Sequence, residues 1–175
     1  YIPQKPNITI VSGAARNAQN ASVLGTQADG PGMIFADFAG PSITLDSQYN
    51  INGFGLQDVT LVGNRVAGGR AVLFLTSTTD FRREFLFDAV TMTRFDIAIA
   101  TDLTTEYPAG NDKSWGVLRV HNSQFTNNRW ISKNLNGGQW QSFIFANNDA
   151  GQNGYQVNEG GLSLAAHNLS IVDNI

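Results

Sequence analysis

The sequence contains no cysteine, only two histidines and only five prolines among its 175 residues. The lack of cysteine excludes disulfide bonds and thiolate metal sites, and two histidines are too few for a typical zinc site. Charged residues make up 14% of the chain, whereas about a quarter is typical of globular proteins. The surface must therefore be built mainly from Asn, Gln, Ser, Thr and Gly side chains.

Long apolar runs and basic tracts are also missing. No stretch is apolar for long enough to cross a bilayer, and no charged-then-apolar leader opens the chain. The formal net charge is −3, which gives no electrostatic footprint for nucleic acid. Runs of Ala, Leu, Glu and Lys are absent, so we expect little helix. The sequence thus predicts no cofactor, no metal site, no nucleic-acid partner and no membrane insertion.

What the chain does contain is a six-residue pattern that recurs five times. The copies begin at Val59, Val90, Ser123, Phe143 and Leu169. The third residue of each copy is large and apolar: Leu61, Met92, Phe125, Phe145 and Ile171. The sixth residue is Asn in four of the five copies. Alternation places the first and third side chains on one face of a strand. A terminal Asn suits a sharp bend, because its amide bonds the local backbone and tolerates left-handed dihedrals.

The spacing of the copies predicts an all-β protein, a β-solenoid with loop insertions between its coils. The steps between copies are 31, 33, 20 and 26 residues, and a β-helix coil takes roughly 20–30 residues. We interpret residues 1–175 as one domain whose main loop insertion covers residues 101–116. The alternative is a β-sandwich, which predicts turn signals every 8–12 residues or so and no fixed register. Because solenoids normally carry polar caps, we expect a segment of a longer chain or ends covered by partners.

Two further segments carry expectations about burial. Residues 71–75 form a continuous apolar run, which predicts a strand covered on both sides. Residues 96–100 alternate, which places Ile97 and Ile99 toward the core. Asp96 and Asp102 then share the outward parity.

Two segments carry a family resemblance, NITIVSGAARNAQNASVL at residues 7–24 and GFGLQDVTLVGN at residues 53–64. They resemble the opening coils of pectate-lyase-like parallel β-helices, in particular bacteriophage tailspike and appendage proteins. The matching positions of the second segment are Leu56, Asp58, Val59, Thr60, Leu61, Gly63 and Asn64. The resemblance implies a right-handed parallel β-helix that assembles as a homotrimer with other virion tail proteins. It also implies binding, and in many members cleavage, of host cell-surface polysaccharide.

Cleavage of a glycosidic bond by hydrolysis needs two carboxylates, roughly 5 Å apart for retention or roughly 6.5–9.5 Å apart for inversion. The candidate catalytic acids are Asp96, Asp102, Glu106 and Glu159. Asp96 and Asp102 share one parity, Glu106 begins the adjacent loop, and coil stacking would bring Glu159 beside them. The competing interpretation is that these acids are solvated surface groups, as most acids are.

Aromatic residues near these acids predict carbohydrate contacts, because flat rings match the C–H faces of sugars. The candidates are Trp115, Trp130, Tyr107 and Tyr155, together with the cation Arg129. For Trp115 and Trp130 the alternative of packing under a loop or at an interface stays open. For Trp140, which follows two glycines, packing is favoured.

Three functions follow as hypotheses. The first is a tailspike-type protein of the virion tail that recognises, and in its active form depolymerises, capsule or O-antigen. The second is a non-catalytic structural fibre or adhesin. The third is a secreted polysaccharide lyase, which is disfavoured because only eleven Lys and Arg are present and none is grouped around the acids in the sequence.

An uncharged strip is expected where the second and fourth positions of the six-residue pattern point outward. In the first three copies these are Thr60, Val62, Thr91, Thr93, Gln124 and Thr126. Such a strip suits packing either against another chain or under a loop of the same chain.

Overall fold

The computed structural model describes residues 1, 7–11, 32–36, 38–46, 51–76, 83–103, 114–136, 139–154 and 159–175. These residues form fifteen strands in three sheets and no helix. Sheet A contains β1 (Thr9–Val11), β4 (Phe54–Gln57), β7 (Glu84–Asp88), β10 (Ser114–His121), β13 (Gln139–Ala146) and β15 (Ala166–Val172). Sheet B contains β2 (Gly32–Ala36), β5 (Val59–Gly63), β8 (Thr91–Thr93) and β11 (Gln124–Thr126). Sheet C contains β3 (Gly40–Asp46), β6 (Gly69–Thr76), β9 (Ile97–Leu103), β12 (Trp130–Asn134) and β14 (Leu162–Ser163).

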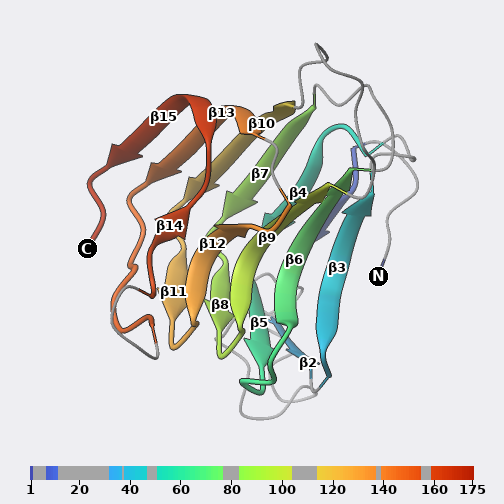
Figure 1. The fold of residues 1–175 in the computed structure, drawn as a ribbon, viewed down its shortest axis with the longest axis vertical. Helices are drawn as coiled ribbons and strands as arrows, with labels where there is room; N and C mark the ends of the chain where they lie inside the picture. The colour runs from blue at the N-terminus through green and yellow to red at the C-terminus, as the bar shows by residue number, and fades with distance from the viewer. Residues whose placement is uncertain are drawn as a thin grey trace, which may run out of the picture.

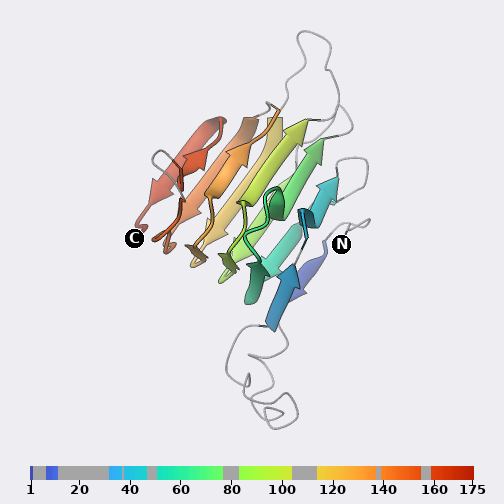
Figure 2. The same ribbon diagram turned by 60° about the horizontal axis from the view of Figure 1, so that its bottom comes forward.

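From β1 to β13 the chain visits the sheets in a fixed cycle, from A to B to C and back to A. Between β13 and β14 the place of a sheet B strand is taken by a single bridge, Gln124 to Asp149. Every strand pairs in parallel with the strand one coil away, so the coils stack from the N-terminal to the C-terminal side (Figure 1). Figure 2 shows the same coils as successive parallel rungs. The predicted β-solenoid is therefore confirmed. The β-sandwich is excluded, because its sheets are antiparallel.

The strand register corrects the predicted repeat. In sheet A, the pairs that run from Leu56 through Phe87, Val120 and Phe145 to Ile171 give steps of 31, 33, 25 and 26 residues. The pattern copies that begin near residues 59, 90 and 123 stack in sheet B, whereas those at residues 143 and 169 lie in sheet A. The predicted step of 20 residues is wrong for this reason. An alternating strand that ends in Asn occurs before both kinds of bend, so the pattern alone does not distinguish the two sheets.

The inner faces of the sheets enclose an aromatic core. Phe74 packs edge-on against Trp140 and Phe85, with ring centroids 4.9 and 5.0 Å apart, and Trp115 lies 5.8 Å from Trp140. Such contacts contribute about 0.5–1.5 kcal/mol each beyond the apolar area that they bury. Of the apolar run at residues 71–75, which predicted a strand covered on both sides, residues 71–74 are buried and Leu75 is partly buried.

The third residues of the pattern point into this core, as predicted. Leu61, Met92, Phe125 and Phe145 are buried. Ile171 remains half exposed, because its strand β15 is the last strand of sheet A in the described part of the chain.

Two predictions about sheet C need correction. Ile99 lies in the main core, but so does Ala98, while Ile97 packs with Leu73 and Ala100 in a smaller cluster on the other side of the sheet. The strand therefore does not alternate strictly. The predicted loop 101–116 is also too long, since β9 continues to Leu103 and β10 begins at Ser114.

The bends that leave sheet A and those that leave sheet B are each made by one residue in the left-handed conformation. The bends from sheet A to sheet B, here called the A/B corner, have φ values of 50–55° at Asp58, Ala89, Asn122, Asn147 and Asp173. The bends from sheet B to sheet C, the B/C corner, have φ values of 56–63° at Arg65, Arg94, Asn127 and Gln152. The expectation that the sixth residue of the pattern would be the left-handed one is wrong. That role belongs to its neighbour, while Asn128, Asn148 and Asn174 bond the adjacent coil.

Asparagine side chains clamp successive coils together at both corners. At the B/C corner, the Phe95 N–H donates to Asn128 Oδ1 at 3.0 Å, and Asn128 Nδ2 donates to the Met92 carbonyl at 2.8 Å. Asn153 repeats this one coil later, because its Oδ1 accepts from the Asn128 N–H and its Nδ2 donates to the Phe125 carbonyl. Each amide thus satisfies backbone groups that the bend removes from the strand ladder.

Asn148 and Asn174 form the equivalent series at the A/B corner. Asn148 Oδ1 accepts from the Ser123 N–H at 2.9 Å, and its Nδ2 donates to the Val120 carbonyl at 3.0 Å. Asn174 bonds the Asn148 N–H and the Phe145 carbonyl in the same way.

Among the described residues there is no helix long and apolar enough to cross a membrane.

Replacing Asn128 with Ala should lower the free energy of unfolding by about 2–5 kcal/mol. The substitution leaves the Phe95 N–H and the Met92 carbonyl without their partner, and a buried unsatisfied group costs about 1–3 kcal/mol. Urea-induced unfolding measures the change. Asn136→Ala is the matched control, because Asn136 is exposed and such substitutions usually stay within about 0.5 kcal/mol. Equal losses in the two variants would contradict the clamp.

Candidate functional site

The structure brings three of the predicted site residues together at the B/C corner. Asp96 lies directly before β9, Arg129 lies one coil later directly before β12, and Glu159 lies before β14. Arg129 Nε donates to Glu159 Oε1 at 2.6 Å, and Arg129 Nη1 forms an ion pair with Asp96 Oδ1 at 3.5 Å. Asp96 Oδ2 also accepts a hydrogen bond from the Gly68 N–H at 2.8 Å. The network therefore links four neighbouring coils, three of them through side-chain ion pairs.

Arg129 dominates the electrostatics of this group. Its pKa is raised above the usual value, first by the hydrogen bond to Glu159, then by the charge of Glu159, with a smaller contribution from Asp96. The side chain of Arg129 is 41% exposed, whereas that of Glu159 is only 9% exposed. The guanidinium thus stays cationic, with one side bound to the acids and the other reaching solvent.

This arrangement is an ion-pair network, with no geometry for acid and base catalysis. A glycosidase needs one protonated carboxyl group to donate a proton to the leaving oxygen. Here the carboxylates of Asp96 and Glu159 act as acceptors toward one shared cation. The sequence analysis placed Arg129 near these acids as a carbohydrate contact, whereas its ion pairs with both carboxylates are a finding of the structure. Coil stacking, which brings residues 96 and 129 side by side, produces them.

Asp102 does not belong to the network. It lies six residues after Asp96 on the same chain segment, which at about 3.3 Å per residue separates the two by roughly 20 Å. Asp102 accepts a hydrogen bond from Asn136 Nδ2 instead. Asp96 and Asp102 therefore cannot act on one glycosidic bond. Glu106, Tyr107 and Tyr155 lie outside the described residues.

The two candidate tryptophans have different environments. Trp115 is 1% exposed and packs in the core against Phe74, so the predicted carbohydrate contact is wrong for this residue. It was assigned to a loop, but β10 begins one residue earlier and points its side chain inward. Trp130 lies on the outer side of sheet C, packed against Ile97, and Lys133 Nζ is 4.8 Å from its ring centroid. Its indole is thus partly covered by a cation. Trp140 packs in the core, as favoured.

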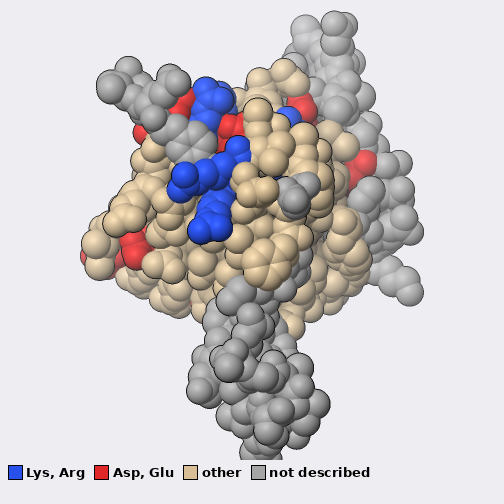
Figure 3. Space-filling model, turned by 90° about the horizontal axis from the view of Figure 1, so that it is seen from below, with Lys and Arg blue, Asp and Glu red and all other residues tan. Residues whose placement is uncertain are grey.

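Sequence reasoning missed two arginines at the same corner. Arg65 and Arg94 are exposed, and the Arg65 N–H donates to the Arg94 carbonyl at 2.7 Å. Arg129 follows in the next coil, where its N–H donates to the Phe95 carbonyl at 3.0 Å. Figure 3 shows basic side chains gathered on this side of the molecule. The signal was present, because residue 94 occupies the fifth position of a pattern copy and residue 65 follows directly after another copy.

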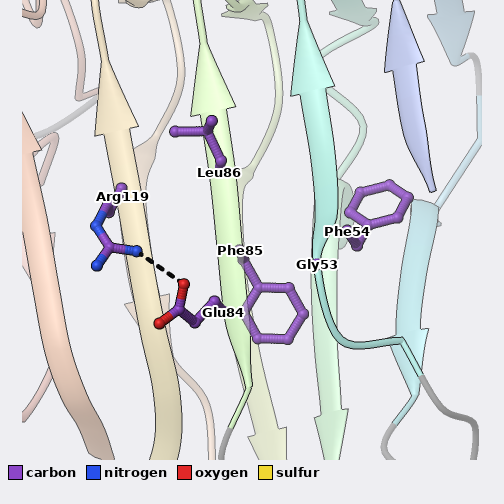
Figure 4. A pocket seen from close by; sticks show the side chains of 6 residues that line it. All are labelled: Gly53, Phe54, Glu84, Phe85, Leu86 and Arg119. Atoms are coloured by element: carbon purple, nitrogen blue, oxygen red, sulfur yellow. Dashed lines mark hydrogen bonds and ion pairs between the residues drawn. The ribbon is translucent and has the colours of Figure 1, made fainter. Parts of the chain in front are cut away.

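The hollows on the described part of the surface include the following three. One beside the B/C corner has a volume of about 310 Å³ and is lined by Phe35, Ala36, Val62, Gly63, Asn64 and Arg94. A second, of about 190 Å³, lies on sheet A beside an exposed Glu84–Arg119 ion pair of 3.4 Å (Figure 4). A third, of about 470 Å³, is lined by Val117, Gln141, Ser142, His167 and Asn168. No group of three His, Asp or Glu that could hold a metal ion occurs among the described residues.

No protein-family model, no curated protein and no solved structure matches the chain. The assignment to the parallel β-solenoids therefore rests on the strand order and register of the structure itself. The resemblance of residues 7–24 and 53–64 to tailspike proteins stays a prediction.

Replacing Arg129 with Gln should destabilise the protein at pH 7 and much less at pH 4. Without the guanidinium, the carboxylates of Asp96 and Glu159 lose the cation that both of them bond. Carboxylates without a cation between them repel each other and cost stability only while they are ionised, so the deficit shrinks as the pH falls. Urea midpoints at both pH values measure it.

Arg119→Gln is the control for this prediction. Its partner Glu84 is well exposed, and exposed ion pairs contribute about 0–1 kcal/mol. We expect a small and nearly pH-independent change. A deficit in Arg129→Gln that persists at pH 4 would contradict the ion-pair network.

Proposed function

We propose that the chain is a receptor-binding β-helix of the tailspike kind, which recognises a bacterial surface polysaccharide along its B/C corner. One observation carries the proposal: Arg65, Arg94 and Arg129 come from three successive coils and lie at the same corner. Arg65 and Arg94 occupy equivalent bend positions, and Arg129 lies two residues after the next bend, beside Asp96. The edge therefore presents guanidinium donors from successive coils along the solenoid axis, which suits an elongated polymer.

Rigidity supports recognition at this edge. The backbone of each arginine is held by hydrogen bonds between coils, such as that from the Arg94 N–H to the Thr126 carbonyl. A surface that is ordered before binding loses little conformational entropy when the ligand arrives. Guanidinium groups suit such a ligand, because they bond both sugar hydroxyls and carboxylates.

Binding without cleavage at this site is part of the proposal. Asp96 and Glu159 are committed to Arg129, so neither is placed as a proton donor for hydrolysis. A lyase needs a cation that holds the uronate carboxylate of its substrate, and Arg129 already pairs with two carboxylates of its own chain. Assembly as a homotrimer, contacts with other tail proteins and location in the virion tail belong to the same proposal. They are supported by the β-solenoid fold and the sequence resemblance.

The test is binding of the purified chain to capsule and O-antigen polysaccharides from a panel of bacteria, measured by interferometry. We expect Arg65→Gln/Arg94→Gln to weaken binding at least about tenfold, since a hydrogen bond to a charged group contributes about 1.5–3 kcal/mol and about 1.4 kcal/mol corresponds to tenfold. Glutamine suits the left-handed backbone, because Gln152 has the same conformation two coils after Arg94. Arg119→Gln, on sheet A, is the control and should bind like the unmodified chain.

The same samples are also assayed for cleavage of the polysaccharide. We expect neither new reducing ends nor the absorbance of unsaturated uronates. Reducing ends would indicate a hydrolase, and the absorbance would indicate a lyase. If the chain binds none of the polysaccharides in the panel, the hypothesis of a non-catalytic structural fibre is favoured.

A further inference from the structure

The hollow beside the B/C corner, here called the Phe35 hollow, lies where three neighbouring strands of sheet B end. The register pairs Phe35 with Val62 and Ala36 with Gly63. One coil later Val62 pairs with Thr93, so Arg94 follows at the next rung. Ala36 packs into the core and Gly63 lies against the Arg94 backbone, so the exposed side chains of Phe35 and Arg94 flank the space. The resulting volume of about 310 Å³ lies at the lower end of ligand pockets, which span about 300–1,000 Å³.

An unusually exposed aromatic ring forms one wall of this hollow. Phe35 is 71% exposed, although it is a large apolar side chain. Leaving such a ring in water is costly. Exposed apolar surface beside a hollow is typical of ligand-binding sites. A flat ring offers a platform for the C–H face of a sugar, in the way that apolar pocket walls hold ligands. Val62 continues the apolar wall.

Arg94 supplies an uncompensated positive charge at the opposite side. Its side chain is exposed and, within the part of the chain that the structure describes, forms neither an ion pair nor a hydrogen bond. Arg119 and Arg129, by contrast, each pair with acids. The hollow therefore combines an apolar wall with one available guanidinium, and none of the described residues that line it is acidic.

We propose that the Phe35 hollow is a subsite for a carboxylated sugar, a uronic acid unit of the bound polysaccharide. The pyranose ring stacks on Phe35 and the carboxylate pairs with Arg94. Guanidinium and carboxylate form two parallel hydrogen bonds, which fixes orientation as well as charge. This inference rests on the proposed function and names the chemical class of its ligand. It predicts that polysaccharides without acidic units bind more weakly.

The probes are methyl β-glucuronide and methyl β-glucoside, which differ only in the carboxylate. Titration followed by the amide signals of residues around the hollow gives both dissociation constants. For the unmodified chain we expect the glucuronide to bind at least about tenfold more tightly, as one charge-assisted hydrogen-bond pair allows. Arg94→Gln should abolish this preference while the glucoside still binds. Phe35→Leu should weaken both probes, because it removes the ring.

Two controls make the result decisive. Arg119→Gln should keep the preference, and inorganic phosphate should bind far more weakly than the glucuronide. Equal affinity for both sugars, or the same behaviour of Arg94→Gln and Arg119→Gln, would overturn the subsite. Phosphate that binds as tightly as the glucuronide would also overturn the subsite, because the site would then recognise negative charge alone.

The outcome separates this inference from the proposed function. Polysaccharide binding that depends on the corner arginines, with no preference for the glucuronide, would leave recognition intact and overturn only the subsite. Glucuronide binding without any polysaccharide binding would leave the subsite intact and overturn the proposed recognition of a polysaccharide. Sedimentation of Phe35→Leu tests whether Phe35 instead contacts a second copy of the chain. If the substitution converts an oligomer into a smaller species, Phe35 contacts a second copy and the subsite is overturned.

Discussion

The parallel backbone ladder between coils is the interaction on which the rest of the structure depends. A single coil has no second layer to bury its apolar face, so each coil is stable only against its neighbours. The ladder runs through all three sheets and holds the aromatic cluster around Phe74 in one column. The same ladder sets the outer surface, because any residue that pairs in register also places its outward neighbour beside the equivalent residue of the next coil.

The corners protect this ladder where it would otherwise break. Left-handed residues make each bend in one step, and inward asparagines such as Asn128 and Asn148 satisfy the backbone groups that the bend frees. A left-handed conformation disfavours most residues, yet Ala89 and Arg94 adopt it. The stacked neighbours impose this conformation. Because the bend is the same in every coil, the side chains that leave it project along one edge, and this is how arginines distant in sequence become neighbours.

The candidate site shows where inference from residues succeeds and where it stops. Asp96, Arg129 and Glu159 could be named from the sequence, and they do meet. The pairing of both carboxylates with one guanidinium could not be inferred, because the three groups come from three coils whose loop lengths differ. For Trp115 the sequence left carbohydrate contact and packing open, because the loop boundary was placed too late, and a shift of that kind decides which face of a strand a side chain occupies. Arg94 and Phe35 were overlooked, since neither is unusual until the register places them beside one hollow.

The sequence by itself determined the class of fold, since alternating strands that end in Asn at intervals near one coil length have few other solutions. It also determined most of the core, because inward positions follow from the period of a strand. Only the tertiary structure decided the register, the assignment of each pattern copy to sheet A or sheet B, and the pairing of charges at the B/C corner. The physical reason is that these depend on how many residues each loop inserts before the chain returns to the ladder. The residues of a strand do not indicate how long the following loop is.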